Sequence, residues 1–269
     1  MIHLQNKVTT VEKVIAEHCF TGMSVLLPGF VNVGVAETLI DGLLATDITD
    51  LTVISNNTSV PGRGIGKLVR ADRIRKITCS HIGNNSETCE RVVKGEINIT
   101  FCPQGSLCEK VRAGGAGIGG ILTPTGVHTP MQDGKQLLEW DAEKGEYKFV
   151  TADEPQRNKR FILELPLHAD VVFVHAWKAD TFGNVMYRRT SRNFNEAFAT
   201  AADHVIVEAE QIVEVGELDP DQIMTPGFIV DAVVQGKVLT EAYLAITLER
   251  RQQWLLHQQF VILVDAYLL

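Results

Sequence analysis

Short apolar runs alternate with stretches of helical spacing along most of the chain. Most of the runs are rich in Val, Ile and Leu, as strands buried on both faces are. Between them, apolar residues recur three or four positions apart, as on one side of an amphipathic helix. Since such alternation builds parallel sheets, we expect an α/β fold: a mostly parallel open sheet with helices on both faces. The predicted strands are 24–28, 51–55, 73–78, 97–101, 171–175 and 204–208, and the predicted helices are 35–44, 87–94 and 106–112.

Two segments break this rhythm. Residues 139–160 are charged, which predicts a hairpin or loop excursion and not a domain boundary. The tail predicts an amphipathic helix over 239–256 and a strand over 260–264, and its apolar end favours an interface or docking onto the body. We therefore expect one domain, 1–236, followed by a C-terminal extension, 237–269, to which the sequence assigns no role.

Composition narrows the classes of function. The chain has 269 residues, of which 45% are hydrophobic, so it can bury a sizeable core. Its 33 Asp and Glu outnumber 25 Lys and Arg, and this net charge of −8 argues against nucleic-acid binding. No uncharged apolar run of about 18 residues exists to span a membrane, and the first residues lack the layout of a signal peptide. We expect a cytoplasmic protein.

The cysteines give no sign of a metal site or of disulfides. The chain has five, none of them in a CxxC pair. Cys102 and Cys108 are the nearest in sequence and have no His beside them, unlike the ligands of a zinc site. We expect reduced thiols and no metal.

Two glycine-rich segments match nucleotide-binding motifs only superficially. Residues 115–120 satisfy G-x-G-x-x-G, but the segment before them has helical spacing and Pro124 prevents a helix from starting after them. Residues 62–67 miss the P-loop spacing, because Pro61 stands where the first Gly belongs and Leu68 replaces Ser or Thr. A dinucleotide or nucleoside-triphosphate site is not expected in either segment.

A third glycine loop has the right surroundings for a ligand. It lies between a predicted strand and a helix that begins near Val35, where open α/β sheets bind anions with free backbone N–H groups. The alternative is a turn with no ligand. The residues of the loop are Pro28, Gly29, Phe30, Val31, Asn32, Val33 and Gly34.

Neutral amide side chains follow two other predicted strands. Asn56 and Asn57 follow the strand 51–55, and Gln104 follows the strand 97–101. An amide can hydrogen-bond a carboxylate or a thioester carbonyl without carrying charge. The alternative for these amides is Asx-turn and capping chemistry, above all for Asn57.

Other polar residues are open to both structural and functional interpretations. Residues 192–195 are either a polar loop or a support for the wall of the site. His81 and His175 lie near apolar runs, which favours structural histidines over catalytic bases. No Ser-His-Asp set or nucleophile elbow is recognisable.

A series of short motifs follows in order along the chain: Pro28–Gly34, Ile54–Asn57, Pro103–Gly105, Arg112–Gly117, Thr123–Gly126, Ala176–Asp180, Gly183–Asn184 and Ser191–Asn195. Taken together, these motifs resemble the α subunit of family I (3-oxoacid) CoA-transferases. They are also similar to the amino-terminal half of succinyl-CoA:3-oxoacid CoA-transferase, in which the two halves are fused. The resemblance covers roughly residues 8–237.

The resemblance implies a ping-pong transfer of CoA between short-chain carboxylic acids. In the family, a glutamate attacks the acyl-CoA thioester to give an acyl-glutamyl anhydride and CoA thiolate, and the thiolate then forms a glutamyl-CoA thioester. That glutamate belongs to the β subunit. Glu214-Val215-Gly216 matches the wrong part of the family pattern, so no catalytic residue is expected in this chain. The resemblance implies a partner β subunit in an α2β2 assembly, CoA as substrate and no tightly bound cofactor.

The resemblance also implies roles for the candidate residues. The loop 28–34 is associated with CoA, and Asn56 and Gln104 face the reacting carbonyl as neutral donors, with Asn57 a weaker neighbour. The family loop commonly begins Gly-Gly-Phe, whereas here Pro28 removes one N–H donor.

Two other functions remain possible on the sequence. One is a non-catalytic acyl-CoA-binding module. The other is a sugar-phosphate isomerase-like enzyme that would use Glu37 or Asp41 as its base. The sequence does not identify the acyl donor or acceptor, since pocket shape distinguishes such acids by only ~1–3 kcal/mol per methylene.

Overall fold

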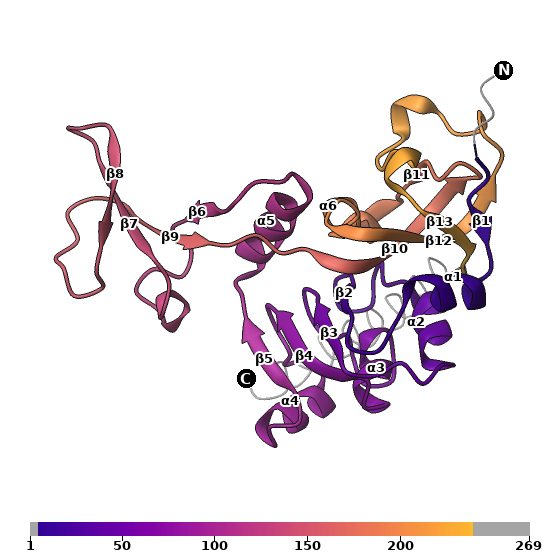
Figure 1. Ribbon diagram of the computed structural model, residues 1–269, viewed down its shortest axis with the longest axis horizontal. Helices are drawn as coiled ribbons and strands as arrows, with labels where there is room; N and C mark the ends of the chain where they lie inside the picture. Colours follow the sequence, from indigo (N-terminus) through magenta and orange to yellow (C-terminus); the bar gives the residue numbers. More distant parts are fainter. Residues whose placement is uncertain (1–4, 239–269) are drawn as a thin grey trace, which may run out of the picture. The chain divides into compact units, whose positions relative to one another are not determined.

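The computed structural model describes residues 5–238, and its largest sheet is almost entirely parallel. Its strand order is β1-β13-β12-β10-β2-β3-β4-β5, and only β11 runs antiparallel to its neighbour, β10. Figure 1 shows β2, β3, β4 and β5 in sequence along this sheet. The strands are β1 (Val8–Thr9), β2 (Ser24–Leu26), β3 (Leu51–Ile54), β4 (Ile74–Cys79), β5 (Asn98–Phe101), β10 (Ala169–Asp180), β11 (Val185–Met186), β12 (Ala202–Val213) and β13 (Ala232–Gln235).

Helices cover both faces of this sheet. Along β10, Val171 and Phe173 pack into one buried core with α1, α2 and α3, whereas Val172 and Val174 pack into a second core with α5 and α6. Side chains of a strand alternate between faces, so both faces of β10 are buried, and the predicted α/β fold is confirmed. The helices are α1 (Val11–His18), α2 (Glu37–Leu44), α3 (Ile65–Arg70), α4 (Ser86–Val93), α5 (Gln104–Gly115) and α6 (Asn195–Phe198), with short 3₁₀ turns at Pro130–Gln132, Arg189–Arg192, Pro220–Gln222 and Gly227–Ile229.

A second sheet of four antiparallel strands lies in the middle of the chain. The predicted excursion at 139–160 contains a hairpin, β7–β8, but this hairpin belongs to a sheet that the pattern did not predict. Glu139 and Arg160 explain the omission: both are buried, and they bond to each other across β7 and β9. Charged residues in a sequence predict an exposed loop, but these two are buried in the sheet because they pair with each other. The strands are β6 (Ile121–Thr123), β7 (Leu137–Asp141), β8 (Glu146–Val150) and β9 (Arg160–Glu164).

The two central strands are longer than predicted. The predicted strands 171–175 and 204–208 end at charged residues, whereas β10 and β12 continue to Asp180 and Val213. Helix α5 begins at Gln104, two residues before the predicted helix. The G-x-G-x-x-G segment starts at the last residue of α5 and opens no helix, in keeping with its rejection as a dinucleotide motif.

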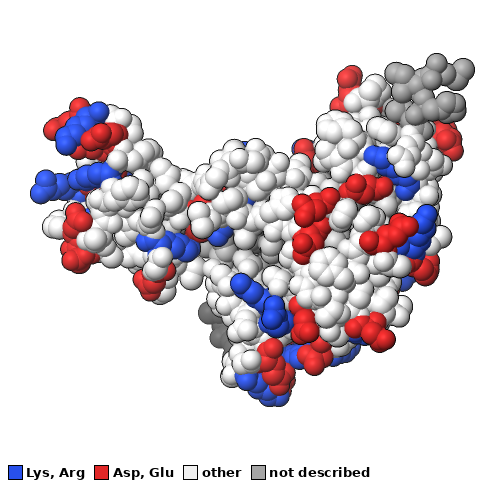
Figure 2. Space-filling model, viewed as in Figure 1, with Lys and Arg blue, Asp and Glu red and all other residues white. Residues whose placement is uncertain are grey.

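The described residues can be searched for membrane-spanning helices, metal sites and disulfides. No helix within residues 5–238 is long and apolar enough to cross a membrane. The same residues contain no group of three His, Cys, Asp or Glu side chains that could hold a metal ion. All five cysteines are free thiols. On the face drawn in Figure 2, basic side chains lie in small groups near acidic ones, with uncharged surface between. The helix predicted at 239–256 and the strand predicted at 260–264 lie outside the described residues.

Candidate functional site

The candidate residues gather at one edge of the parallel sheet. The loop 28–34 follows β2, Asn56 and Asn57 follow β3, and Gln104 follows β5. Since these strands are parallel and neighbouring, their carboxyl ends point to the same edge. Asn57 also forms an isolated parallel bridge with His81, which follows β4. The candidate segments therefore lie at the same end of the sheet, where these parallel strands have their carboxyl ends.

The glycine loop folds into a tight turn of its own. The backbone N–H of Phe30 bonds the carbonyl of Val33 at 2.9 Å, and the N–H of Val33 bonds the carbonyl of Phe30 at 3.0 Å. Val31, between them, has a φ of 58°, an unusual conformation for a β-branched residue. Such strain persists only where the surroundings hold it.

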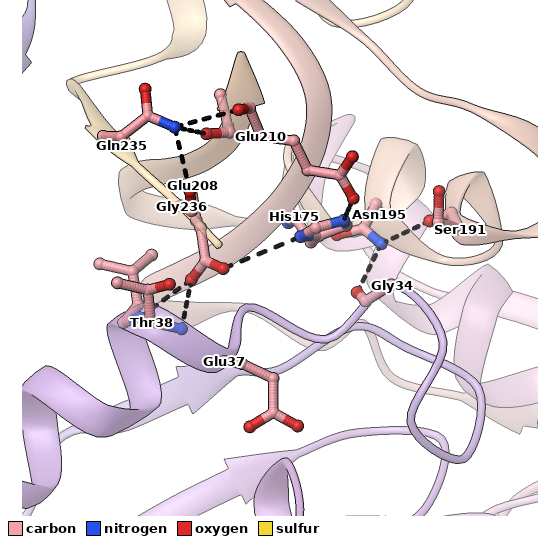
Figure 3. Close-up of polar contacts among 12 residues, drawn as sticks. Gly34, Glu37, Thr38, His175, Ser191, Asn195, Glu208, Glu210, Gln235 and Gly236 are labelled. Carbon is pink, nitrogen blue, oxygen red and sulfur yellow. Dashed lines mark hydrogen bonds and ion pairs between the residues drawn. The ribbon is translucent and has the colours of Figure 1, made fainter. Parts of the chain in front are cut away.

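The segment Ser191–Asn195 holds this loop in place. The side-chain amide of Asn193 donates to the carbonyl of Val33 at 2.9 Å, and that of Asn195 donates to the carbonyl of Gly34 at 2.8 Å (Figure 3 shows the second bond). Gly34 has a φ of 73°, and a Cβ there would lie 2.5 Å from the backbone oxygen of Ser191. Of the two interpretations of residues 192–195, support for the loop is the one that these bonds favour.

A cavity lies beside the loop. Its volume is about 640 Å³, within the range of small-molecule sites. Phe30, at the turn of the loop, contributes a side chain that is 48% exposed. Arg192 pairs with Glu196 at 2.6 Å. The lining residues are Phe30, Val33, Arg189, Thr190, Arg192 and Asn193.

The amides of Asn56 and Asn57 are linked to each other. The Nδ2 of Asn57 donates to the Oδ1 of Asn56 at 2.7 Å, and the Oδ1 of Asn57 accepts from the N–H of Ser59 at 2.8 Å. The second bond is the Asx turn predicted as the alternative role of Asn57. Both residues are buried. Among the described residues, the Nδ2 of Asn56 has no acceptor, so it is the end of this pair that can donate to a ligand.

Gln104 is the first residue of α5, the helix that follows β5, and β5 lies next to β4 in the sheet. Its side chain is exposed and bonds to no other residue in the part of the chain that the structure describes. Three hydroxyls that the sequence did not point to, those of Ser55, Ser80 and Ser106, are buried at the same end of the sheet and lack a partner among the described residues. Buried polar groups of this kind are satisfied by ordered water or a ligand.

A buried group of charges stands behind the loop, on the paired strands β10 and β12. The ring of His175 lies 3.9 Å from the Oε1 of Glu208 and 3.4 Å from the Oε1 of Glu210 (Figure 3). Burial acts to lower the pKa of His175, but the two carboxylates outweigh it and raise the pKa to about 9. The burial and the two carboxylate neighbours favour a structural role for His175, the interpretation that the sequence also favours. Glu208 and Glu210 were missed, because only the register of β10 with β12 brings them to it.

Glu208 also fills the place where a ligand anion was expected. Its Oε2 accepts from the backbone N–H groups of Thr38 and Leu39 at 2.7 and 2.9 Å. These are first-turn amides of α2, the helix that follows the glycine loop. The expectation that this helix start offers free N–H groups to a ligand is therefore wrong at Thr38 and Leu39, because a carboxylate of the protein already occupies them.

The carboxylates proposed as bases for an isomerase are paired. The Oε1 of Glu37 accepts from the N–H of Gly64 at 2.8 Å, and Lys67 contacts both Glu37 and Asp41. Burial acts to lower the pKa of Lys67, but Asp41 and Glu37 together raise it. Because Lys67 already contacts both carboxylates, this arrangement does not favour the isomerase.

Comparison with known proteins decides the family. The family model described as Coenzyme A transferase matches residues 8–236. The chain belongs to the coenzyme A transferase family.

Two bacterial relatives are matched over most of their length. The chain is 42% identical over 213 residues to the alpha subunit of acetate CoA-transferase from Escherichia coli, a match that covers 79% of this chain and 90% of that protein. It is 38% identical over 214 residues to the alpha subunit of acetoacetyl-CoA:acetate/butyrate CoA transferase from Clostridium acetobutylicum, covering 80% and 91%.

A solved structure shares the fold of this coenzyme A transferase family member. Glutaconate coenzyme A-transferase from Acidaminococcus fermentans matches with a TM-score of 0.71 at 21% identity, covering 86% of this chain and 76% of that one. The predicted resemblance to CoA-transferase α subunits is confirmed. The roles of the loop 28–34, Asn56, Asn57 and Gln104 stay predictions.

Proposed function

We propose that this chain is the α subunit of a CoA-transferase that moves CoA between short-chain 3-oxo acids and other small carboxylates. The observation that carries the proposal is the 42% identity to the alpha subunit of an acetate CoA-transferase, across 90% of that protein. The nucleophilic glutamate comes from a β subunit, in an α2β2 assembly. CoA is a substrate, no cofactor is tightly bound, and the cytoplasm is the proposed compartment.

The chain contributes polar contacts to the reacting carbonyl. When the glutamate that the β subunit supplies attacks the acyl-CoA thioester, negative charge develops on the carbonyl oxygen and CoA leaves as a thiolate. In the proposed mechanism Asn56 donates its Nδ2 to that oxygen, since its Oδ1 is already bonded to Asn57. Gln104 donates from the start of α5. Neutral donors aimed at such an oxygen stabilise the transition state without a proton transfer.

The glycine loop contributes shape more than charge. Its turn is closed by the bonds between Phe30 and Val33, and the first turn of α2 is bonded to Glu208. Acyl-CoA therefore contacts the exposed Phe30 and the cavity beside it rather than the amides of Thr38 and Leu39.

An assay of CoA transfer tests the proposal. The chain is purified alone and also co-expressed with a β subunit, and each is given acetoacetyl-CoA and acetate. We expect no transfer by the chain alone and turnover when the β subunit is present. Robust transfer by the chain alone would place the nucleophile within these 269 residues and overturn the proposal.

The same samples address the alternative of a non-catalytic acyl-CoA-binding module. Such a module binds CoA esters by itself and gives no covalent glutamyl intermediate with any partner. Tight binding of acetoacetyl-CoA to the isolated chain, with no transfer in the presence of a β subunit, would favour the module.

A further inference from the structure

The carboxyl end of the glycine loop has two attachments, and both lead to the same pair of buried residues. At its carboxyl end, the loop continues into α2, whose first-turn amides of Thr38 and Leu39 bond the Oε2 of Glu208. At Gly34, the backbone carbonyl accepts from the side-chain amide of Asn195 at 2.8 Å. The ring of His175 lies beside Glu208, as Figure 3 shows.

The attachment through α2 exists because the helix lacks a cap of its own. The residue at its N-cap is Ala36, which has no side-chain acceptor, and no side-chain cap bond is present. By contrast, α1 and α4 are capped locally by Thr10 and Asn85. An uncapped helix start leaves N–H donors that need an acceptor. Glu208, which lies on β12 more than 160 residues away, supplies a charged one at the positive end of the helix.

The attachment through Asn195 arises where a neighbouring strand ends. Strand β2 pairs with β10 only as far as Leu26 and Val172, so the N–H of His175 on that edge finds no strand partner there. It donates instead to the Oδ1 of Asn195 at 2.9 Å. This bond orients the amide of Asn195, whose Nδ2 then faces Gly34.

The pair is enclosed and surrounded by a small set of groups. Glu208 is 0% and His175 3% exposed. Glu210 on β12 is a further charged neighbour, with its Oε1 at 3.4 Å from the ring. Gly236 packs directly on Glu208, since a Cβ there would lie 3.1 Å from its Cδ and closer still to its Cγ. The side chain of Glu208 cannot shift without moving the first turn of α2, which it holds.

We propose that Glu208 is a positioning residue that fixes the glycine loop 28–34 through the first turn of α2, and that the backbone N–H of His175 fixes the same loop through Asn195. Neither residue touches substrate. The effect on catalysis rests on the proposed function of the loop, whereas the effect on the loop itself does not.

Glu208→Gln is the variant that tests this role. It keeps the size of the side chain and one acceptor oxygen, but removes the charge that faces the helix start and the ring of His175. We expect hydrogen exchange of the amides in 28–44 to rise about 10-fold, as expected for loss of a helix cap. In the enzyme assembled with its β subunit, kcat/KM for acyl-CoA should fall by a similar factor while the subunits stay associated.

Glu139→Gln is the matched control. Glu139 is equally buried and bonds to Arg160, but within the four-stranded antiparallel sheet. Glu139→Gln should lower thermal stability, but it should leave both the hydrogen exchange of the amides in 28–44 and kcat/KM unchanged. If Glu208→Gln does not fold, Glu208→Asp keeps the charge and shortens the reach to Thr38 and Leu39, and the same rise in exchange is expected.

The two readouts separate the two proposals. Exchange in 28–44 at the wild-type level in Glu208→Gln or Glu208→Asp would overturn the positioning role. Increased exchange in a protein whose wild type transfers no CoA with its β subunit would support the positioning role and overturn the proposed function.

Discussion

Asn57 fixes the orientation of Asn56. Its Nδ2 donates to the Oδ1 of Asn56 at 2.7 Å, and its own Oδ1 is held by the N–H of Ser59. Because the oxygen of Asn56 is thereby occupied, its amide nitrogen is the atom left to donate to a ligand. One asparagine of the pair thus acts as the proposed contact to substrate and the other as its support.

We expect Asn56→Ala to lower kcat of the assembled enzyme by about 10²–10³-fold, the usual effect of removing one oxyanion donor. Asn57→Ala should have a smaller effect, because Asn56 is retained but no longer oriented. Steady-state kinetics with acetoacetyl-CoA and acetate measure both. If Asn56→Ala turns over at the wild-type rate, Asn56 does not contact the reacting carbonyl.

Gln104→Ala should lower turnover without dissociating the subunits. The side chain is exposed and bonds to no other described residue, so its removal should change the free energy of unfolding by less than about 0.5 kcal/mol. Glu109→Gln, further along α5, serves as a control that alters the same helix. Equal rates for Gln104→Ala and the control would remove Gln104 from the site.

Gly34→Ala tests whether the loop packs as tightly as the structure shows. Gly34 and Gly95 have nearly equal φ values, 73° and 75°, but a Cβ at Gly34 would lie 2.5 Å from the oxygen of Ser191, whereas a Cβ at Gly95 meets nothing within 4 Å. Gly95→Ala should lower the free energy of unfolding by about 1 kcal/mol, from backbone strain alone. Gly34→Ala should lower it by at least about 2 kcal/mol more, because the added methyl group overlaps its neighbours. Urea unfolding measures both, and equal costs would contradict the packing.

His175 should make stability depend on pH on the alkaline side. Its pKa is raised to about 9 in the folded chain, whereas an unfolded histidine has a pKa of about 6.5. The protonated ring therefore stabilises the folded chain, and this stabilisation is complete below pH 6.5. This contribution, on the order of 3 kcal/mol, should be lost as the pH rises from about 6.5 through 9. Urea unfolding across this range should show the decline, and His175→Gln should flatten it. An unchanged pH dependence in that variant would refute the assignment.

The parallel strands and the segments that follow their carboxyl ends can be predicted from the sequence, because the local hydrophobic pattern determines both. Apolar runs place β2, β3 and β5, and loop 28–34, Asn56 and Gln104 directly follow these strands. Hydrogen-bond partners that lie far apart in the sequence cannot be predicted from such a local pattern. Nothing local to Glu208 indicates that it caps α2, because the bond depends on sheet order and on the absence of a cap at Ala36.

The same limit applies to the second sheet. Its strands are short and carry charged residues that are buried only because they pair, such as Glu139 with Arg160. A pattern based on hydrophobicity reads such residues as exposed. The small sheet therefore resembles a loop in sequence, whereas Val171 to Val174 are apolar on both faces and are unmistakable as a buried strand.

The central claim is that this chain supplies the binding surface and that its partner supplies the nucleophile. Mass spectrometry of both proteins after incubation with acetoacetyl-CoA tests it most directly. We predict a CoA adduct on a glutamate of the β subunit, and an unmodified α chain. A CoA adduct on a glutamate of this chain would contradict the account.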